Sequence, residues 1–389
     1  MHTGQLIFAQ LLEFLPRYEF TLCVRRYRGH YRVRDFSCFD QFLCLAFAQL
    51  TGRQSLRDIE TCLRAVGPKL YHAGFRGAVS RSTLADANER RDWRIYADFA
   101  QVLIVRARRL YAGEDFGVEL DQTAYVLDST LIDLCLSLFP WARYRRHDGA
   151  VKLHTLLDLR GSIPCSVRVS DGRMADVEVL DELVFEPGAF YIMDRGYIDF
   201  GRLYRLAQNL AYFLIRSRKK VIHRVLSRMA VDRSTGLLSD HVIRLRNPST
   251  GQRYPAPLRR VGYTAPETRR HFVFLTNHFQ LAALSVAELY RCRWRVELFF
   301  KWIKQHLRIE AFFGTSENAV KTQVWIAISV YVLVAIVKKE MKIDRPLNEI
   351  LQIFNMTLFE KVPMSQALTT IRPEDGKSGC RNSLPLFDF

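Results

Sequence analysis

Hydrophobic residues follow a helical spacing in the first part of the chain and a strand-like spacing in the second, and the change falls near residue 120. In the first part, apolar residues recur every three to four positions over 39–50 and 95–110, as in helices that bury one side. Ser55 and Ser82 each precede a further short amphipathic stretch, and serine is a typical residue at a helix start. We therefore predict a helical region over residues 1–115.

Beyond residue 120 the apolar residues come in short runs, which is typical of β-strands. Five such runs are 124–128, 153–159, 163–170, 189–194 and 211–217. A helix-like stretch precedes the fifth run. A segment rich in Arg, Ser, Gly and Pro, residues 218–270, follows it, before a returning strand at 271–277. The predicted order is that of a ribonuclease H-like domain: three strands come first, alternating helices and strands follow, and a mostly β insertion precedes the last helix. The predicted fold class is α/β and multidomain, with a helical N-terminal region and a ribonuclease H-like mixed-sheet core that the insertion interrupts.

The last helix of this predicted core carries a row of polar residues. Because an α-helix turns about 100° per residue, one side of it would present Tyr290, Arg293, Glu297, Lys301 and Lys304 within a wedge of roughly 60°. The opposite side is apolar and can pack into a core; its residues are Val286, Leu289, Val296, Phe300 and Ile303. Ser285 and Glu288 form an S-x-x-E capping box, which predicts the helix start. A solvated helix face held by pairs of opposite charge is the alternative interpretation of the row.

The net charge of the chain bears on whether this row of polar residues binds a ligand. The chain of 389 residues has a net charge of +17 and a pI near 9.7, which implies attraction to a polyanion, first nucleic acid and second an anionic membrane surface. Basic residues gather with aromatic ones at 25–34 and 141–146, and a third basic cluster spans 216–224. The eight cysteines show no metal-binding spacing and predict reduced thiols in a cytoplasmic protein. The uncharged apolar run 324–337 is too short to span a membrane and predicts a buried helix.

Two aspartates stand where predicted strands stop. Asp128 ends the first strand and Asp194 ends the fourth. In the predicted order these strands are neighbours, so their ends bring the two carboxylates together. A shared divalent cation relieves the repulsion between carboxylates, and Glu297 on the last helix supplies a third acid. Three such acids suit two Mg²⁺ ions about 3.5–4 Å apart, which activate a nucleophile and stabilise the leaving oxygen of a phosphoryl transfer. Taken alone, each strand-end aspartate has a simpler explanation as a cap or turn residue.

Taken together, these residues resemble the DDE transposases of the insertion sequence 4 family. The family signature Y-(2)-R-(3)-E-(6)-K is matched without a spacing error at Tyr290, Arg293, Glu297 and Lys304. The blocks 127–130 and 194–197 resemble the regions that carry the family's first and second acids, and the resemblance extends from the helical region to about residue 340. It implies a catalytic and metal-binding triad of Asp128, Asp194 and Glu297, with Mg²⁺ or, as a substitute, Mn²⁺. It also implies cut-and-paste chemistry at the terminal inverted repeats of a mobile element.

Several further residues are expected to contact DNA. Arg293, Lys301 and Lys304 can hold backbone phosphates, and Tyr290 can bond a phosphate or stack on a displaced base. Arg195 and Tyr197 are given the same role, with a buried structural ion pair as the alternative for Arg195. The second capped helix would offer DNA a set of four residues, with simple helical packing as the alternative; they are Arg81, Ser82, Thr83 and Asn88. Lys152 and His154 can approach the acids from the second strand, His154 more simply as a structural residue. Asp171 and Asp176 are expected at a turn and a helix start, with contact to the metal site as the alternative.

The predicted organisation has three parts. A helical N-terminal DNA-binding domain covers 1–115, a ribonuclease H-like DDE catalytic domain covers 116–345 with its β insertion at about 218–270, and a C-terminal region covers 346–389. The predicted function is a DNA transposase that binds the inverted repeats of an insertion sequence, cleaves DNA strands and transfers them to a target. Its expected partners are double-stranded DNA and, when assembled on DNA, a second copy of the chain, with no membrane; the expected location is cytoplasmic and nucleoid-associated. A nuclease without strand transfer and an inactive DNA-binding regulator are the alternative functions.

Overall fold

The chain divides into two compact units. The computed structural model describes residues 4–31, 33–67, 69–145, 148–217, 221–306 and 312–369. Of these residues, the helical unit comprises those within 1–113, 131–151 and 299–369, and the sheet unit comprises those within 114–130 and 152–298. Five members of the basic clusters lie outside the described residues; they are Arg32, Arg146, Arg218, Lys219 and Lys220.

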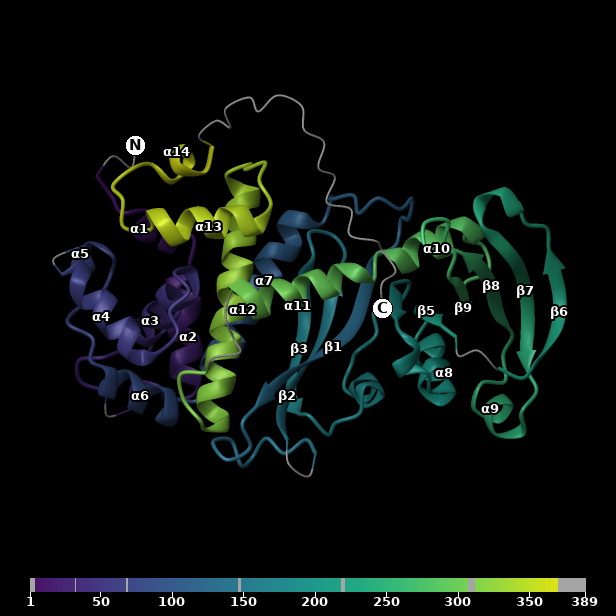
Figure 1. Cartoon of the computed structure of the whole chain (residues 1–389), viewed down its shortest axis with the longest axis horizontal. Helices are drawn as coiled ribbons and strands as arrows, with labels where there is room; N and C mark the ends of the chain where they lie inside the picture. Colours follow the sequence, from purple (N-terminus) through teal and green to yellow (C-terminus); the bar gives the residue numbers. More distant parts are fainter. Residues whose placement is uncertain are drawn as a thin grey trace. The chain divides into compact units, whose positions relative to one another are not determined.

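The helical unit is built around α12 (Glu317–Glu340), a helix of 24 residues. Its other helices are α1 (Ile7–Leu12), α2 (Arg17–Arg26), α3 (Cys38–Leu50), α4 (Leu56–Val66), α5 (Lys69–His72), α6 (Arg81–Arg90), α7 (Arg94–Tyr111), α13 (Leu347–Thr357) and α14 (Met364–Thr369). α12 packs against α3, α6, α7 and α13 (Figure 1). By length and composition α12 could cross a membrane, but 94% of its most apolar window is buried inside the protein. The prediction of a buried helix over 324–337 is therefore confirmed, and so are the helices predicted at 39–50 and 95–110.

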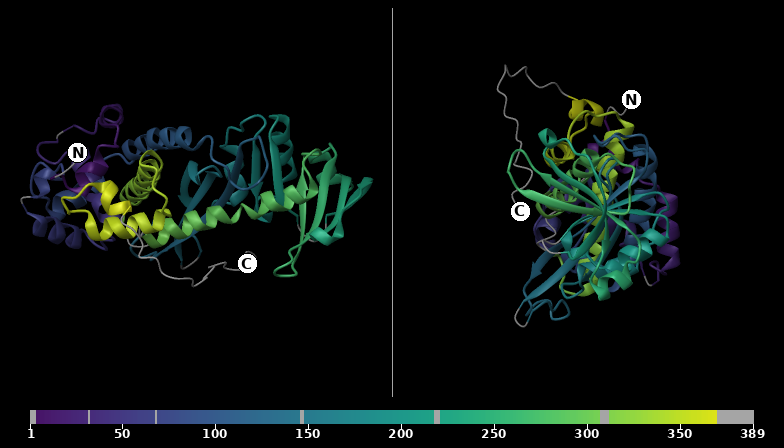
Figure 2. Two further views of the ribbon diagram at one scale, coloured as in Figure 1. Left: turned by 90° about the horizontal axis from the view of Figure 1, so that it is seen from above. Right: turned by 90° about the vertical axis from the view of Figure 1, so that its right-hand side faces the viewer.

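The sheet unit is organised around a sheet of nine strands in the order β3-β2-β1-β4-β5-β9-β8-β7-β6. The strands are β1 (Ala124–Leu134), β2 (Gly149–Asp158), β3 (Ile163–Asp171), β4 (Phe190–Met193), β5 (Tyr212–Arg216), β6 (His223–Met229), β7 (Leu237–Leu245), β8 (Leu258–Thr264) and β9 (His271–Thr276). Seen along the sheet in Figure 2, right, successive strands rotate strongly against one another, as the intrinsic twist of β-strands requires. The mixed sheet and its strand order confirm the predicted α/β fold class.

The register of the central strands aligns the ends that carry charged residues. β1 and β4 pair in parallel from Ala124↔Phe190 to Leu127↔Met193. β4 and β5 pair in parallel as well, up to Met193↔Ile215. Each of the three strands is apolar through its last paired residue, and these residues are buried except for the half-buried Tyr212. The next residues along the chain, Asp128, Asp194 and Arg216, therefore come at the same edge of the sheet.

The predicted β insertion extends the same sheet. Strands β6, β7 and β8 are antiparallel neighbours, and β8 pairs with β9, which returns to β5. A buried ion pair joins the middle of this extension: Nη2 of Arg259 lies 2.7 Å from Oδ2 of Asp240, and both residues are 3% exposed. The same guanidinium donates to the backbone oxygens of Phe279, at 3.2 Å, and of Leu281, in the connection that leads to α10 (Ala283–Arg291). Arg259 thereby holds the connection that leads into α10.

Several local predictions were wrong. The continuous helix expected from Ser285 to Lys304 is two helices, α10 and α11 (Trp294–His306), and the residue that precedes α10 as its cap is Ala282. The second capped helix starts from Ser80, whose Oγ accepts from the N–H of Thr83, so Ser82 lies inside its first turn. Ser55 does cap α4, as predicted.

The connections of the core and the C-terminal region also differ from the expectation. Between β3 and β4 lies a short 3-10 helix, η1 (Asp176–Asp181), and between β4 and α8 (Phe200–Gln208) a second one, η2 (Arg195–Tyr197). The region after 345 has helices α13 and α14, which the sequence pattern did not reveal. α13 packs on α3 and α12, and α14 on α1 and α13, so these segments belong to the helical unit.

Candidate active site

Asp128, Asp194 and Glu297 all belong to the sheet unit, and the guanidinium of Arg293 joins two of them. Nη1 of Arg293 donates to Oδ2 of Asp128 at 2.7 Å. Its Nη2 donates to Oε1 of Glu297. The side chains of Arg293 and Asp128 are only 18% and 19% exposed. The structure therefore brings an acid from the end of β1 and an acid from α11 around one largely buried cation.

The third acid, Asp194, is held by a different set of side chains. Nε of Arg216 lies 2.8 Å from its Oδ1, and Nη2 of Arg216 donates to Oδ2 at 3.1 Å. The Tyr290 hydroxyl donates to Oδ1 at 3.0 Å. Burial alone would raise the pKa of Asp194. The N–H of Arg195 and the charges of Arg216 and Arg293 outweigh that effect, together with the Tyr290 hydroxyl, so the pKa of Asp194 is lowered.

Asp128 is perturbed in the opposite direction. Burial raises the pKa of Asp128 to about 6, although Arg293 and the N–H of Ser129 act to lower it. The negative charges of Glu297 and Asp194 add to the rise. The three carboxylates therefore share one electrostatic environment, in which Asp194 is the acid that stays ionised and Asp128 the one that exchanges a proton near pH 6.

A break between two helices lets neighbouring residues reach different acids. α10 ends at Arg291 and α11 begins at Trp294, so Cys292 and Arg293 form the connection. Before the break, the ring of Tyr290 packs against Phe274 of β9, with 4.7 Å between the ring centres. Tyr290 then reaches Asp194, while Arg293 reaches Asp128 and Glu297. α11 is anchored beyond the break by buried Val296, Phe299, Phe300 and Ile303.

The three carboxylates suit a divalent cation by the chemistry of their donor atoms. Mg²⁺ prefers carboxylate oxygens, and a shared cation relieves the repulsion from Glu297 and Asp194 that adds to the effect of burial on the pKa of Asp128. In the part of the chain that the structure describes, however, no three acid, cysteine or histidine side chains stand close enough together to hold a metal ion. Arg293 supplies the positive charge between Asp128 and Glu297, so metal binding there requires its guanidinium to turn away from the acids.

The other predicted residues around the triad have unequal access to a ligand. Lys301 is exposed, and Lys304 is partly buried, with its Nζ donating to the backbone oxygen of Leu131 at 2.6 Å. Arg195 is exposed, which removes the alternative of a buried ion pair for this residue. Tyr197 is only 2% exposed and belongs to the hydrophobic core beneath the sheet edge, so its predicted DNA contact is wrong.

Arg216 is a residue of the site that the sequence analysis missed. It directly follows the fifth apolar run, just as Asp128 and Asp194 follow the first and the fourth. A cation at the end of a strand next to those of the two aspartates comes at the same sheet edge as they do. The position of Arg216 after the fifth run was therefore a signal for it in the sequence.

In the helical unit, α6 presents some of its predicted DNA contacts and buries one. Arg81, Ser82 and Thr83 are exposed. Asn88 is 2% exposed; its Oδ1 accepts from Nε2 of Gln41 at 2.8 Å, and its backbone oxygen accepts from Nδ2 of Asn318 at 2.8 Å. The predicted DNA contact of Asn88 is therefore wrong, because its side chain holds α6 against α3.

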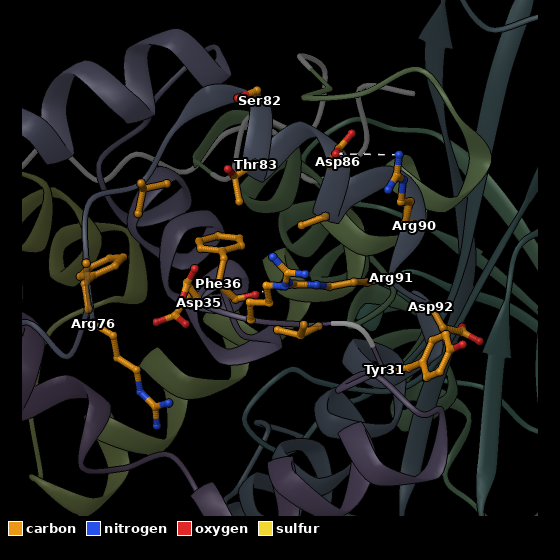
Figure 3. A pocket seen from close by; sticks show the side chains of 18 of the residues that line it. Tyr31, Asp35, Phe36, Arg76, Ser82, Thr83, Asp86, Arg90, Arg91 and Asp92 are labelled. Carbon is orange, nitrogen blue, oxygen red and sulfur yellow. Dashed lines mark hydrogen bonds and ion pairs between the residues drawn. The ribbon is translucent and has the colours of Figure 1, made fainter.

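The exposed side of α6 lines a cavity of about 1310 Å³. Figure 3 shows Ser82, Thr83, Asp86 and Arg90 along this helix, with Arg91 reaching toward Phe36 across the floor of the cavity. The lining contains both signs of charge, and a weak ion pair of 3.9 Å joins Arg90 to Asp86 on the exposed face. The cavity is therefore polar and cationic in part, as a phosphate-contacting surface requires.

Comparison with known proteins supplies the family. The family model described as "Transposase DDE domain" matches residues 119–333, and a model described only as a domain of unknown function matches residues 3–76. The "Putative transposase y4zB" of Sinorhizobium fredii is 29% identical over 282 residues, which cover 72% of this chain and 77% of that protein. The "Probable transposase for insertion sequence element IS5377" of Geobacillus stearothermophilus is 32% identical over 211 residues, 54% of this chain and 55% of that protein. Among solved structures, a piggyBac transposase in a synaptic complex with hairpin DNA matches 92% of this chain and 78% of that chain, at 11% identity and a TM-score of 0.45.

Proposed function

The chain belongs to the family of transposases with a DDE domain and is an enzyme that acts on DNA, and we propose that Asp128, Asp194 and Glu297 are the acids on which its activity depends. The observation that carries this proposal is the meeting of Asp128 and Glu297 at one guanidinium, beside the strand end that bears Asp194. The three acids follow β1, follow β4 and lie on α11, and these elements are far apart in sequence. The opposite pKa shifts of Asp128 and Asp194 support a functional site as well, because such shifts concentrate where groups do chemistry.

The proposed cofactor is Mg²⁺, with Mn²⁺ as a substitute, held by the three acids. When bound, the metal would lower the pKa of an attacking water or 3′-hydroxyl and stabilise the leaving oxygen of the phosphoryl group. Arg293 would then release Asp128 and Glu297 and contact a DNA phosphate, to which its planar guanidinium is suited. Arg216 and Tyr290 would keep the carboxylate of Asp194 oriented through their present contacts.

The proposed reaction has two stages, both of them in-line phosphoryl transfers on DNA. Water first cleaves a strand at each end of the element, and the freed 3′-hydroxyl then attacks a phosphodiester of the target. Lys301, Lys304 and Arg195 would hold phosphates of the bound strands, and Arg81, Ser82 and Thr83 of α6 would contact the inverted repeat. Since two ends must be cut and joined together, we propose a dimer on DNA, in the cytoplasm at the nucleoid.

Cleavage of labelled DNA tests the acids. The substrate carries the inverted repeats that flank the gene, and the wild type is compared with Asp194→Asn in Mg²⁺ and in Mn²⁺. Glu182→Gln is a matched control, because this acid is exposed and lies in a surface ion pair with Arg168 at 3.3 Å, away from the three acids. We expect nicking at the repeat ends by the wild type and the control but not by Asp194→Asn. Cleavage by Asp194→Asn at the wild-type rate would remove Asp194 from the mechanism.

A second assay separates the transposase from the two other functions. Pre-cleaved ends are incubated with a supercoiled target plasmid, and joined products are scored. A nuclease without strand transfer would nick the ends and yield no joined product. A DNA-binding regulator would bind the ends equally well with and without metal and yield neither product.

A further inference from the structure

A second cluster of polar side chains lies beside Asp128, and the proposed mechanism does not use it. Its centre is Asp176, the first residue of η1. Oδ1 of Asp176 accepts from Oγ of Ser129 at 2.7 Å and from Nζ of Lys152 at 3.1 Å. Lys152 also donates to the backbone oxygen of Met174 at 2.7 Å and is 9% exposed. A buried lysine thus compensates the charge of Asp176.

Ser129 connects this cluster to the candidate active site. Its backbone N–H donates to Oδ1 of Asp128 at 2.8 Å, while its Oγ donates to Asp176. One residue therefore contacts both carboxylates, from the position directly after Asp128 on β1. Beyond Leu127, β1 has no partner on the β4 side, since the parallel register ends there. The side-chain bond of Ser129 supplies an anchor at the point where the β1–β4 pairing stops.

The turn that follows Asp194 packs against the same carboxylate. η1 and η2 are in contact, and a Cβ added to Gly196 would lie 3.7 Å from Oδ2 of Asp176. The hydroxyl of Tyr197 is buried, and its burial raises its pKa, with the negative charges of Asp128 and Asp176 adding to the rise. Asp176 therefore faces the segments that carry the first and the second acid of the triad.

The remaining neighbour, His154, adds no positive charge to this cluster. It is 1% exposed; its Nε2 lies 3.2 Å from Oγ of Ser170, and its Nδ1 lies 4.0 Å from Oδ1 of Asp176. Burial lowers the pKa of His154 to about 4. The imidazole is therefore neutral at ordinary pH, which leaves Lys152 as the cation that compensates Asp176.

We propose that Asp176, compensated by Lys152, is a positioning residue that holds the carboxylate of Asp128 in the orientation needed for metal binding, through the hydroxyl of Ser129. This inference rests on the proposed function, because it assigns Asp128 as a metal ligand. Residues that orient metal ligands change metal affinity by about 10- to 100-fold when they are replaced. A merely structural Lys152–Asp176 pair would affect folding but would not depend on the hydroxyl at position 129.

Titration of the purified full chain with Mn²⁺ tests the proposal, with free Mn²⁺ followed by electron paramagnetic resonance and without any DNA. We expect Ser129→Ala and Asp176→Asn to weaken Mn²⁺ binding by about 10-fold or more. Ser129→Thr keeps the hydroxyl on a residue that suits a strand, so its affinity should stay within about twofold of the wild type. Ser170→Ala is the matched control, because it removes a hydroxyl from the same cluster that contacts neither Asp128 nor Asp176.

The double variant Ser129→Ala/Asp176→Asn measures whether the two side chains affect Mn²⁺ affinity independently or through each other. If Ser129 acts through Asp176, the double variant should bind Mn²⁺ no more weakly than Asp176→Asn alone. Wild-type affinity in both single variants, or equal losses in Ser129→Thr and Ser129→Ala, would overturn the inference. Thermal unfolding without metal identifies variants that fail to fold; if Ser129→Ala or Asp176→Asn is one of them, the other single variant and Ser170→Ala are the informative pair. No Mn²⁺ binding by the wild type would instead contradict the proposed metal site, and this inference would fall with it.

Discussion

Replacing Asp128 by asparagine should change how the stability of the metal-free protein depends on pH. The pKa of Asp128 in the folded protein is about 6, against an ordinary value of 3.8. The folded state therefore holds a proton that the unfolded state has already lost over this interval. The wild type is expected to lose about 3 kcal/mol of stability between roughly pH 4 and pH 6 through this one group, because each pKa unit corresponds to about 1.36 kcal/mol.

Asparagine cannot ionise, so Asp128→Asn lacks this loss. The two proteins are compared by urea unfolding with a chelator present, at intervals from pH 4 to pH 7.5. The measured quantity is the difference between their free energies of unfolding, in which the titration of all other groups cancels to first order. The difference should shift in favour of Asp128→Asn by about 3 kcal/mol as the pH rises from about 4 to about 6, and stay constant above that.

Asp194→Asn is the control, with the opposite sign. The pKa of Asp194 is lowered in the folded protein, so its contribution to stability is present at neutral pH and is lost as the pH falls. The free energy of unfolding of the wild type, relative to that of Asp194→Asn, should therefore increase as the pH rises. Relative to that of Asp128→Asn, it should decrease. A flat difference for Asp128→Asn, or the same sign for both variants, would refute the argument that burial outweighs Arg293 at Asp128.

Four further predictions concern single contacts. Arg293→Gln should lower the rate of DNA cleavage by about 100-fold or more in the nicking assay, because a charged donor to the phosphate is lost; near wild-type cleavage would contradict the assigned role. Asn88→Ala should cost about 1–3 kcal/mol in urea unfolding, because it leaves buried partners unpaired. Ser82→Ala should cost little stability but weaken binding to the inverted repeat in a gel-shift assay, and the reverse pattern would refute the orientation of α6. Asp240→Asn should cost about 3–5 kcal/mol, because it leaves Arg259 buried without its counter-charge; a cost below 1 kcal/mol would show that the pair is dispensable.

The core of the sheet could be predicted from the sequence because apolar runs of strand length are a direct signal. The run that ends at Leu127 and the run that ends at Met193 both stop at an aspartate, and the structure pairs these two strands in parallel. The family resemblance rested on spacing within residues 290–304, which does not depend on whether one helix or two carry it. The predicted strand neighbours and the family resemblance were therefore unaffected by the wrongly predicted start and continuity of the last helix.

The parts that failed depend on tertiary contacts that leave no local signal. The break at Cys292 and Arg293 has neither glycine nor proline, and it forms where Arg293 pairs with two acids. Asn88 looks like an exposed polar residue in sequence, but Gln41, 47 positions earlier, provides its partner. Tyr197 stands next to a site residue, yet its ring is needed in the core. The position of a polar residue on a predicted helix does not show whether its side chain bonds to a residue far away in the sequence.

The hydrogen bonds from Arg259 to the connection before α10 limit which parts of the insertion relatives of this transposase can lose. The insertion between β5 and β9 looks like a removable addition, because the two flanking strands pair directly with each other. However, β7 and β8 supply the Asp240–Arg259 pair that holds the residues leading into α10, and α10 carries Tyr290. A shortened descendant that joined β5 to β9 would keep its sheet and lose the support of the helix next to its acids. We therefore expect relatives to vary in length at the outer strand β6 and its turns, and to retain β7 and β8.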